Sequence, residues 1–264
     1  MEKKILLPKK NAAYVIMVLF FLIKGIIYGV FITPPYPGTS PDDSGQISYV
    51  IYIAKEHRLP LLHETKIEET VKNCISDYAR KDFNSFSASK NTYNIGIGAF
   101  ESSGRLNWIV QHPPLYYLFL LPFYMISTVF TRSLPAIIIV MRMATLVFLG
   151  CGTLLCLIKI LDLLAVSGIA RKCILIAFLF SPAIQYFLVM IDNDAMVIFL
   201  AMLSFYLFFK YLIEGSLKAL YGFSVVCGCI MITKYTGGLI LPAYAIMYLY
   251  HALLIKKNKA VVVL

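Results

Sequence analysis

The sequence predicts an all-α polytopic membrane protein, and three observations lead to that prediction. Of the 264 residues, 59% are hydrophobic, and the mean hydropathy is +0.77. Only 14% of the residues are charged, whereas a soluble domain carries about 25%. The apolar residues fall in long runs, and the backbone polar groups of such runs can be satisfied inside a bilayer only if the runs are helices.

Six of these runs are expected to cross the membrane, because a helix of ~20 apolar residues spans the hydrocarbon core. They cover residues 12–33, 136–158, 173–191, 195–213, 219–233 and 238–255. Together they form a single membrane-embedded module over residues 1–264. The sequence ends with a short apolar stretch after a basic patch, so one interpretation is that it is the N-terminal part of a longer protein.

The net charge of +10 comes from basic residues that gather at the ends of the apolar runs. Lys3, Lys4, Lys9 and Lys10 precede the first run, and a basic patch over residues 256–259 follows the last one. This pattern is a signal of membrane topology, and no nucleic-acid partner is expected. By the positive-inside rule, the N-terminus lies in the cytoplasm.

Residues 34–135 are expected to form a long first extracytoplasmic loop. Within it, the sequence Ser-Pro-Asp-Asp at 40–43 has the form of a helix start, with Ser as the N-cap and Pro at the first helical position. We therefore expect an amphipathic helix over residues 41–58 that lies along the membrane surface. Its apolar face is formed by Ile47, Val50, Ile51 and Ala54.

The apolar segment 113–131 decides the membrane topology. If it crosses the bilayer, the basic loop 159–172 lies outside and Asp192 lies inside. If it does not cross, the basic loop is cytoplasmic and Asp192 shares a side with Asp42. The positive-inside rule favours the second arrangement, and Pro122, together with Pro113 and Pro114 at the start of the segment, favours a non-crossing path. We expect a non-crossing or re-entrant segment.

Five motifs occur in an order that resembles a known superfamily. They are PDD after the first span, HPPLYY, MRMATLVFLG, SPAIQYFLVMIDNDA and ITKYTGGLILP. In this order they resemble the GT-C superfamily of integral-membrane glycosyltransferases, and within it the protein O-mannosyltransferase and aminoarabinose transferase group. The resemblance implies a GT-C-type transmembrane helical module whose long first extracytoplasmic loop carries juxtamembrane helices. Two departures are the short chain and His112, where some relatives have Lys.

The resemblance also implies that Asp42 and Asp43 are catalytic and that Asp192 and Asp194 form a second acidic site. A carboxylate suits the base that activates the acceptor in sugar transfer, and Asp42 is the expected base. A structural interpretation stays open for each pair. Asp42 and Asp43 would complement the dipole of a helix start, and Asp192 and Asp194 would form a solvated turn.

Three further residues are implied to bind the donor phosphate, namely Arg142, Lys234 and His112. Cations and hydrogen-bond donors stabilise the charge of a departing phosphate. The structural alternatives are that Arg142 snorkels to the nearer membrane face, that Lys234 is an interfacial anchor, and that His112 supports the fold. Tyr116 and Tyr117 are expected in the aromatic belt at the membrane interface.

The expected function is that of a mannosyltransferase-like glycosyltransferase. It would act on the non-cytoplasmic side of the membrane and invert the configuration at the anomeric carbon. The resemblance implies a polyprenyl-phosphate-linked sugar as donor. The partners are this donor, membrane lipids, and an unidentified protein, lipid or glycan acceptor. Oxygen ligands between the two acidic sites would suit Mg²⁺ or Mn²⁺, but the relatives generally need no metal, and no cofactor is predicted.

The location expected for this multi-pass protein is the bacterial cytoplasmic membrane or the endoplasmic reticulum membrane. Two other functions stay open. In a transporter or flippase-like protein, Arg142, Lys234 and the second acidic site would line a substrate path, and internal repeats would be expected. A non-catalytic GT-C relative is the other alternative, because the short chain would lack part of a donor site.

Overall fold

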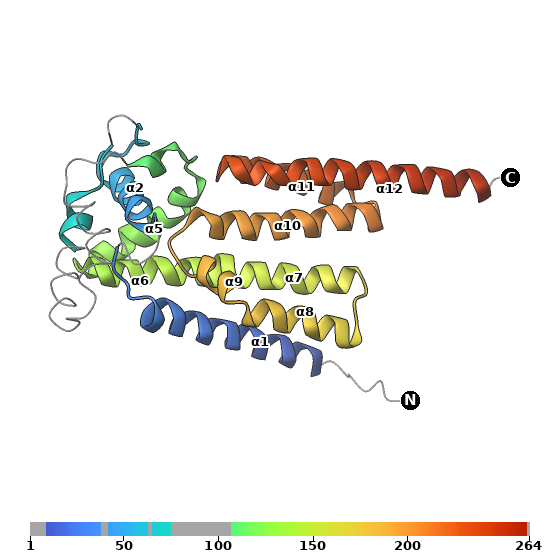
Figure 1. The fold of residues 1–264 in the computed structure, drawn as a ribbon, viewed down its shortest axis with the longest axis horizontal. Coiled ribbons are helices and arrows are strands. Elements are labelled where there is room, and N and C mark those ends of the chain that lie inside the picture. Colours follow the sequence, from blue (N-terminus) through green and yellow to red (C-terminus); the bar gives the residue numbers. More distant parts are fainter. Residues whose placement is uncertain (1–8, 38–41, 63–64, 75–106, 263–264) are drawn as a thin grey trace, which may run out of the picture.

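The computed structural model describes residues 9–37, 42–62, 65–74 and 107–262, and within them every regular element is a helix. The long helices lie side by side along one axis (Figure 1). The predicted all-helical class is therefore confirmed. Within these ranges, three helices are long and apolar enough to cross a membrane. They are Ala13–Ile32, Leu134–Leu163 and Asn193–Glu214.

The first of these combines two elements, because α1 (Lys9–Ile26) continues directly into the π-helix η1 (Ile27–Ile32). Its apolar residues lie where the sequence predicts the first span. Lys24 interrupts that apolar run, and its Nζ donates a hydrogen bond of 2.7 Å to the carbonyl oxygen of Leu179. The amine lies 5.3 Å from the centroid of the Phe180 ring. The ammonium group is thus satisfied by another part of the bundle.

The second long helix is built from α6 (Leu134–Ala144), the π-helix η3 (Thr145–Gly150) and α7 (Cys151–Leu163). It runs without interruption for 30 residues, which is longer than the expected 136–158. Proline at the start of α6 has no backbone N–H to leave unpaired, so it favours helix initiation there.

The single helix expected over residues 173–191 is divided into two in the structure. Helix α8 (Gly168–Phe180) ends at Ser181, and the short helix α9 (Pro182–Phe187) begins at the next residue. Ser181 has an extended conformation, and its hydroxyl accepts a hydrogen bond from the backbone N–H of Ile184. Ser and Pro act here as the N-cap and first residue of a new helix.

The chain then forms α10 (Asn193–Glu214), α11 (Leu217–Met231), a 3-10 turn η4 (Tyr235–Leu239) and α12 (Ile240–Val262). Helix α10 ends at Gly215, whose φ of +68° is the left-handed conformation that favours glycine at a helix C-terminus. Helix α11 is apolar but shorter than the helices that could cross a membrane.

The two ends of the bundle differ in what they carry. The connections α7–α8 and α10–α11 lie at the end where the N-terminal part of α1 begins (Figure 1). The other end, which we call the site end, carries Thr33 after η1 and the first residues of α6 and α10. Helix α5 (Leu115–Phe130) also lies there. Its first N–H donates to the carbonyl of Ile232 after α11, and it leads into α6, so α5 starts and finishes at the site end.

The predicted surface helix 41–58 is observed as α2 (Asp43–Glu56), with Asp42 as its N-cap. The predicted N-cap and first helical position, residues 40 and 41, lie outside the described residues. The expectation of an exposed polar face is wrong, because α2 is buried on nearly all sides. Asn107 Nδ2 donates to Gly45 O at 2.9 Å, and Ser48 Oγ accepts from the N–H of Glu68 at 3.1 Å.

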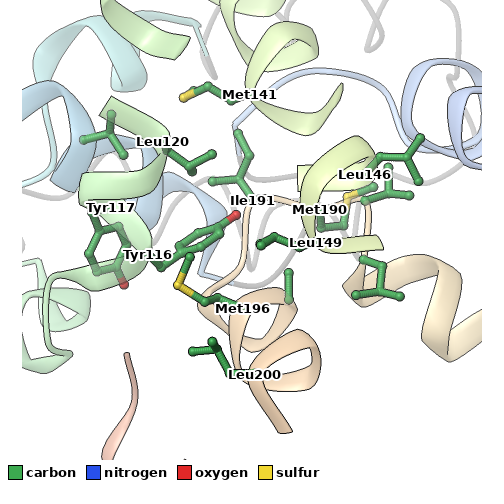
Figure 2. Packing of buried hydrophobic residues seen from close by; sticks show 14 of the residues in the cluster. Tyr116, Tyr117, Leu120, Met141, Leu146, Leu149, Met190, Ile191, Met196 and Leu200 are labelled. Carbon is green, nitrogen blue, oxygen red and sulfur yellow. The ribbon is translucent and has the colours of Figure 1, made fainter. Parts of the chain in front are cut away.

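One apolar core joins α5, α6, η3, α10 and the segment 188–191. Figure 2 shows side chains of this core: Tyr116, Tyr117, Leu120, Met141, Leu146, Leu149, Met190, Ile191, Met196 and Leu200. Tyr116 and Tyr117 are fully buried, so the prediction that they belong to an interfacial belt is wrong. The Tyr116 hydroxyl lies 3.2 Å from Thr145 Oγ1, which satisfies both groups in the core.

Candidate functional site

A cluster of polar and charged side chains lies at the site end of the bundle. It combines parts of the chain that are distant in sequence, because Gln46 of α2 donates from Nε2 to Asp192 Oδ1 at 3.3 Å. The charge of Asp42 also acts on Asp192. We call Asp42, Asp192 and Asp194 the carboxylate cluster. The structure thus brings the two acidic segments predicted from the sequence into one place.

Asp42 and Asp43 have different surroundings although they are adjacent. Asp42 is exposed and has a φ of +64°, a left-handed conformation that costs a non-glycine residue about 1–2 kcal/mol. Asp43 is buried, and its charge acts on Arg142. Asp42 therefore belongs to the carboxylate cluster, whereas Asp43 lies close enough to Arg142 of α6 for the two charges to interact. Strain at Asp42 is of the kind that is found at functional sites.

Asp192 is held in place by two hydrogen bonds to one oxygen atom. Oδ1 accepts from the backbone N–H of Asp194 at 3.0 Å, as the N-cap of α10, and from Gln46 Nε2. Burial raises the pKa of Asp192 to about 6, and the charges of Asp194 and Asp42 act in the same direction. The hydrogen bond from the Asp194 N–H and the charge of Lys234 oppose this increase.

Lys234 forms an ion pair with Asp194, with 2.7 Å between Nζ and Oδ1. Both side chains are partly exposed to solvent. His112 lies close enough for their charges to act on it, and burial together with Lys234 lowers the pKa of His112, so its imidazole is neutral at pH 7. The three predicted residues Asp194, Lys234 and His112 therefore share one environment.

Arg142 is the predicted site residue with the most distinct surroundings. Its side chain is 1% exposed. Nη1 donates to the carbonyl oxygens of Gly29 and Thr33 at 2.8 Å and of Pro34 at 3.3 Å. These carbonyls lie in and just after η1, where helix-end carbonyls need external donors. Arg142 thus joins the end of the first long helix to α6, so it does not snorkel to a membrane face. To bind the donor phosphate as predicted, Arg142 would have to give up these hydrogen bonds to the backbone carbonyls.

Two residues that contribute to this site were not predicted, namely Gln46 and Asn193. Asn193 Nδ2 donates to the Tyr117 hydroxyl at 3.4 Å, and the Tyr117 ring stacks on Tyr49 with 3.8 Å between centroids. In the described part of the chain, the buried Gln46 Oε1 and Asn193 Oδ1 have no hydrogen-bond partner. The only hint in the sequence was the position of these two residues relative to the predicted acids. Gln46 lies one helical turn after Asp42, and Asn193 lies between the two acids.

Among the residues that the structure describes, no group of three or more His, Cys, Asp or Glu side chains is placed to hold a metal ion. The site offers a half-buried carboxylate with a pKa of about 6, an exposed carboxylate, one ion-paired ammonium and a neutral imidazole. Such a set can accept a proton from one ligand and bind the negative charge of another.

No family model, no curated protein and no solved structure matches this chain. Fold and site therefore carry the functional inference. The fold is a helical bundle with three helices that could cross a membrane, and the site is the cluster of polar residues at one end of it.

Proposed function

We propose that this chain is a multi-pass membrane glycosyltransferase that transfers a sugar from a polyprenyl-phosphate donor to an acceptor at the site end. One observation carries the proposal. Gln46 and Asp192, 146 positions apart in the sequence, are hydrogen-bonded, and this contact joins the two acidic segments that the resemblance to GT-C enzymes implies. A transferase needs this convergence, because base and donor-binding groups must surround one reacting carbon.

The ends of the bundle support a non-cytoplasmic location for the site. The start of α1 and the basic loop 159–172 lie at the end opposite the carboxylate cluster (Figure 1). Arg171, in the first turn of α8, donates to the hydroxyl of Tyr14 at 2.8 Å. The positive-inside rule assigns such a basic end to the cytoplasm. Because α5 starts and finishes at the site end, this arrangement agrees with a segment 113–131 that does not cross the bilayer.

The chemistry of the cluster suits the two halves of sugar transfer. A carboxylate accepts the proton of the acceptor hydroxyl or amine. Lys234 is partly exposed, and its ammonium group is paired with Asp194. It would bind the donor phosphate by leaving Asp194 and pairing with the phosphate. His112 would donate or accept a hydrogen bond beside it. Exposed apolar faces of the long helices would hold the polyprenyl chain in the membrane.

The proposal is tested with purified protein in liposomes and a panel of polyprenyl-phosphate sugars tritiated in mannose, glucose or 4-amino-4-deoxyarabinose. We expect the wild-type protein to transfer the tritiated sugar from one of these donors to an acceptor or to water. Lys234→Met should reduce this rate at least about tenfold, because one charge-assisted contact to phosphate is lost. The control is Glu214→Gln at the opposite end, whose Oε2 lies 3.9 Å from Lys210 Nζ and which should retain the wild-type rate.

Other outcomes of this assay separate the alternatives. A folded wild type that turns over no donor would contradict the transferase proposal. Donor binding without turnover would favour a non-catalytic relative. The break between α8 and α9 favours a transporter as the second candidate, because discontinuous helices form many transporter substrate sites. In that case labelled substrate would move across the liposome membrane without covalent transfer.

A further inference from the structure

We infer that Asp192 is the general base of the transfer reaction, an inference that rests on the proposed function. In this step, Asp192 Oδ2 takes the proton of an acceptor hydroxyl while the acceptor oxygen bonds to the anomeric carbon of the sugar. The bond from that carbon to the phosphate oxygen breaks, and its electron pair leaves with the lipid phosphate. The assignment differs from the resemblance, which names Asp42.

The orientation of the Asp192 carboxylate is the first support. Oδ1 is fixed by two donors, the Asp194 backbone N–H and Gln46 Nε2. Among the described residues, no group donates a hydrogen bond to Oδ2. One oxygen is therefore anchored by α10 and α2 together, and the other is left for a ligand. An anchored carboxylate needs little reorganisation when it accepts a proton.

The second support is a pair of buried oxygen atoms that have no hydrogen-bond partner in the described part of the chain. They are Gln46 Oε1 and Asn193 Oδ1. The Gln46 amide contacts the Asp192 carboxylate directly, whereas the Asn193 amide donates to the Tyr117 hydroxyl. Burying an acceptor without a donor costs about 1–3 kcal/mol. The Gln46 oxygen has almost no exposed surface, so a sugar or acceptor hydroxyl that binds Asp192 would satisfy it once the Gln46 amide turns toward the ligand.

Asp42 fits the role of base less well. Its side chain makes no capping hydrogen bond to α2, and the residue is exposed. An exposed carboxylate is surrounded by water, which competes for the acceptor proton. We assign Asp42 an electrostatic role, since its negative charge acts on both Asp192 and His112.

Several charged or titratable groups face Asp192. They are Asp194 on its own helix, Lys234 before η4, Asp42 at the start of α2, and Tyr116 on α5. Burial raises the pKa of Asp192 to about 6, Asp194 and Asp42 raise it as well, and Lys234 lowers it. A base must be deprotonated to act, so the transfer rate should fall as the pH drops through about 6.

The test is the pH dependence of donor turnover between about pH 4.5 and 8.5, measured in the liposome assay with the active donor. In the wild type, the rate should fall below about pH 6, and we call this fall the acidic limb. Asp192→Asn should reduce the rate at least about 100-fold and remove the acidic limb. Asp192→Glu should keep an acidic limb but have a lower rate. Asp42→Asn should move the limb to lower pH, because it removes a negative charge. Lys234→Met should move the limb to higher pH, and Glu214→Gln should leave it unchanged.

The outcomes distinguish this inference from the proposed function. If the wild type turns over no donor, the proposed function fails and the assignment fails with it. If the wild type is active and Asp192→Asn keeps its rate and acidic limb, the assignment alone is overturned. The same holds if Asp42→Asn, rather than Asp192→Asn, removes the limb. If Asp192→Asn does not fold, Asp192→Glu carries the test, because a wild-type rate in that variant would overturn the assignment.

Discussion

The substitution Arg142→Met tests whether a buried guanidinium connects the first two long helices. Methionine keeps most of the apolar length of the side chain and removes every donor. In the wild type, Nη1 donates to the carbonyls of Gly29, Thr33 and Pro34. After the substitution, these three carbonyls lose a donor at a helix end, and the buried Asp43 loses a positive charge that acts on it.

The size of the effect follows from the burial of Arg142, which is 1% exposed. Removing one partner from a buried charged network costs about 3–5 kcal/mol, because the remaining groups stay buried without compensation. Two of the three hydrogen bonds are 2.8 Å long, and the third is 3.3 Å. We therefore expect a loss of about 3–5 kcal/mol in the free energy of unfolding, or on the order of 10 °C in melting temperature.

The assay is thermal unfolding of the purified protein in detergent, followed by intrinsic tyrosine fluorescence and by size-exclusion chromatography. The matched control is Arg171→Met at the opposite end, which removes a partly exposed pair with Asp162 at 3.0 Å and a hydrogen bond to Tyr14 and should cost less, about 1–2 kcal/mol. Arg142→Lys should lie between the wild type and Arg142→Met, since an ammonium group reaches fewer carbonyls. Equal melting temperatures for Arg142→Met and the wild type would refute the reasoning.

Three further substitutions test the fold. Asn107→Ala removes the hydrogen bond to Gly45 of α2 and the capping bond from the N–H of Ile109, so thermal unfolding should show a loss of about 1–3 kcal/mol; an unchanged midpoint would contradict this. Gly29→Leu should abolish a monodisperse chromatographic peak, because a Cβ there would overlap a packed valine, whereas Gly228→Ala meets no neighbour and should behave as the wild type. In a cysteine-free background, an impermeant thiol reagent should label Trp108→Cys from outside but not Ser167→Cys; labelling of both positions would rule out the proposed topology.

Hydropathy predicted where the long helices lie but not where they break. The residues of 173–191 are mostly apolar, so their composition favours one helix. The interruption at Ser181 depends on a local capping hydrogen bond and on Pro182, which a hydropathy average does not register. Helix α2 was predicted from its apolar positions, but the loop residues that bury its polar face are distant in sequence. No local pattern indicates that they pack there.

The candidate site was predicted residue by residue but not as an arrangement. Acids near apolar runs are unusual enough to be noticed, which is why Asp42 and Asp192 stood out. Their convergence depends on Gln46, an ordinary helix residue whose role appears only when α2 lies beside α10. The partners of Arg142 are backbone carbonyls, which have no signature in the amino-acid sequence.

The hydrogen bonds from Arg142 to backbone carbonyls restrict some positions of the sequence and leave others open to substitution. Arg142 binds the chain after η1 through main-chain oxygens, so the side chains at positions 33 and 34 are free to change as long as the backbone path is kept. Position 142 does not have this freedom, because no other side chain offers the same planar set of donors. Gly29 is restricted for a different reason, since any side chain there would meet Val189. Among natural variants of this protein, we expect substitutions to be frequent at 33 and 34 and rare at 29 and 142.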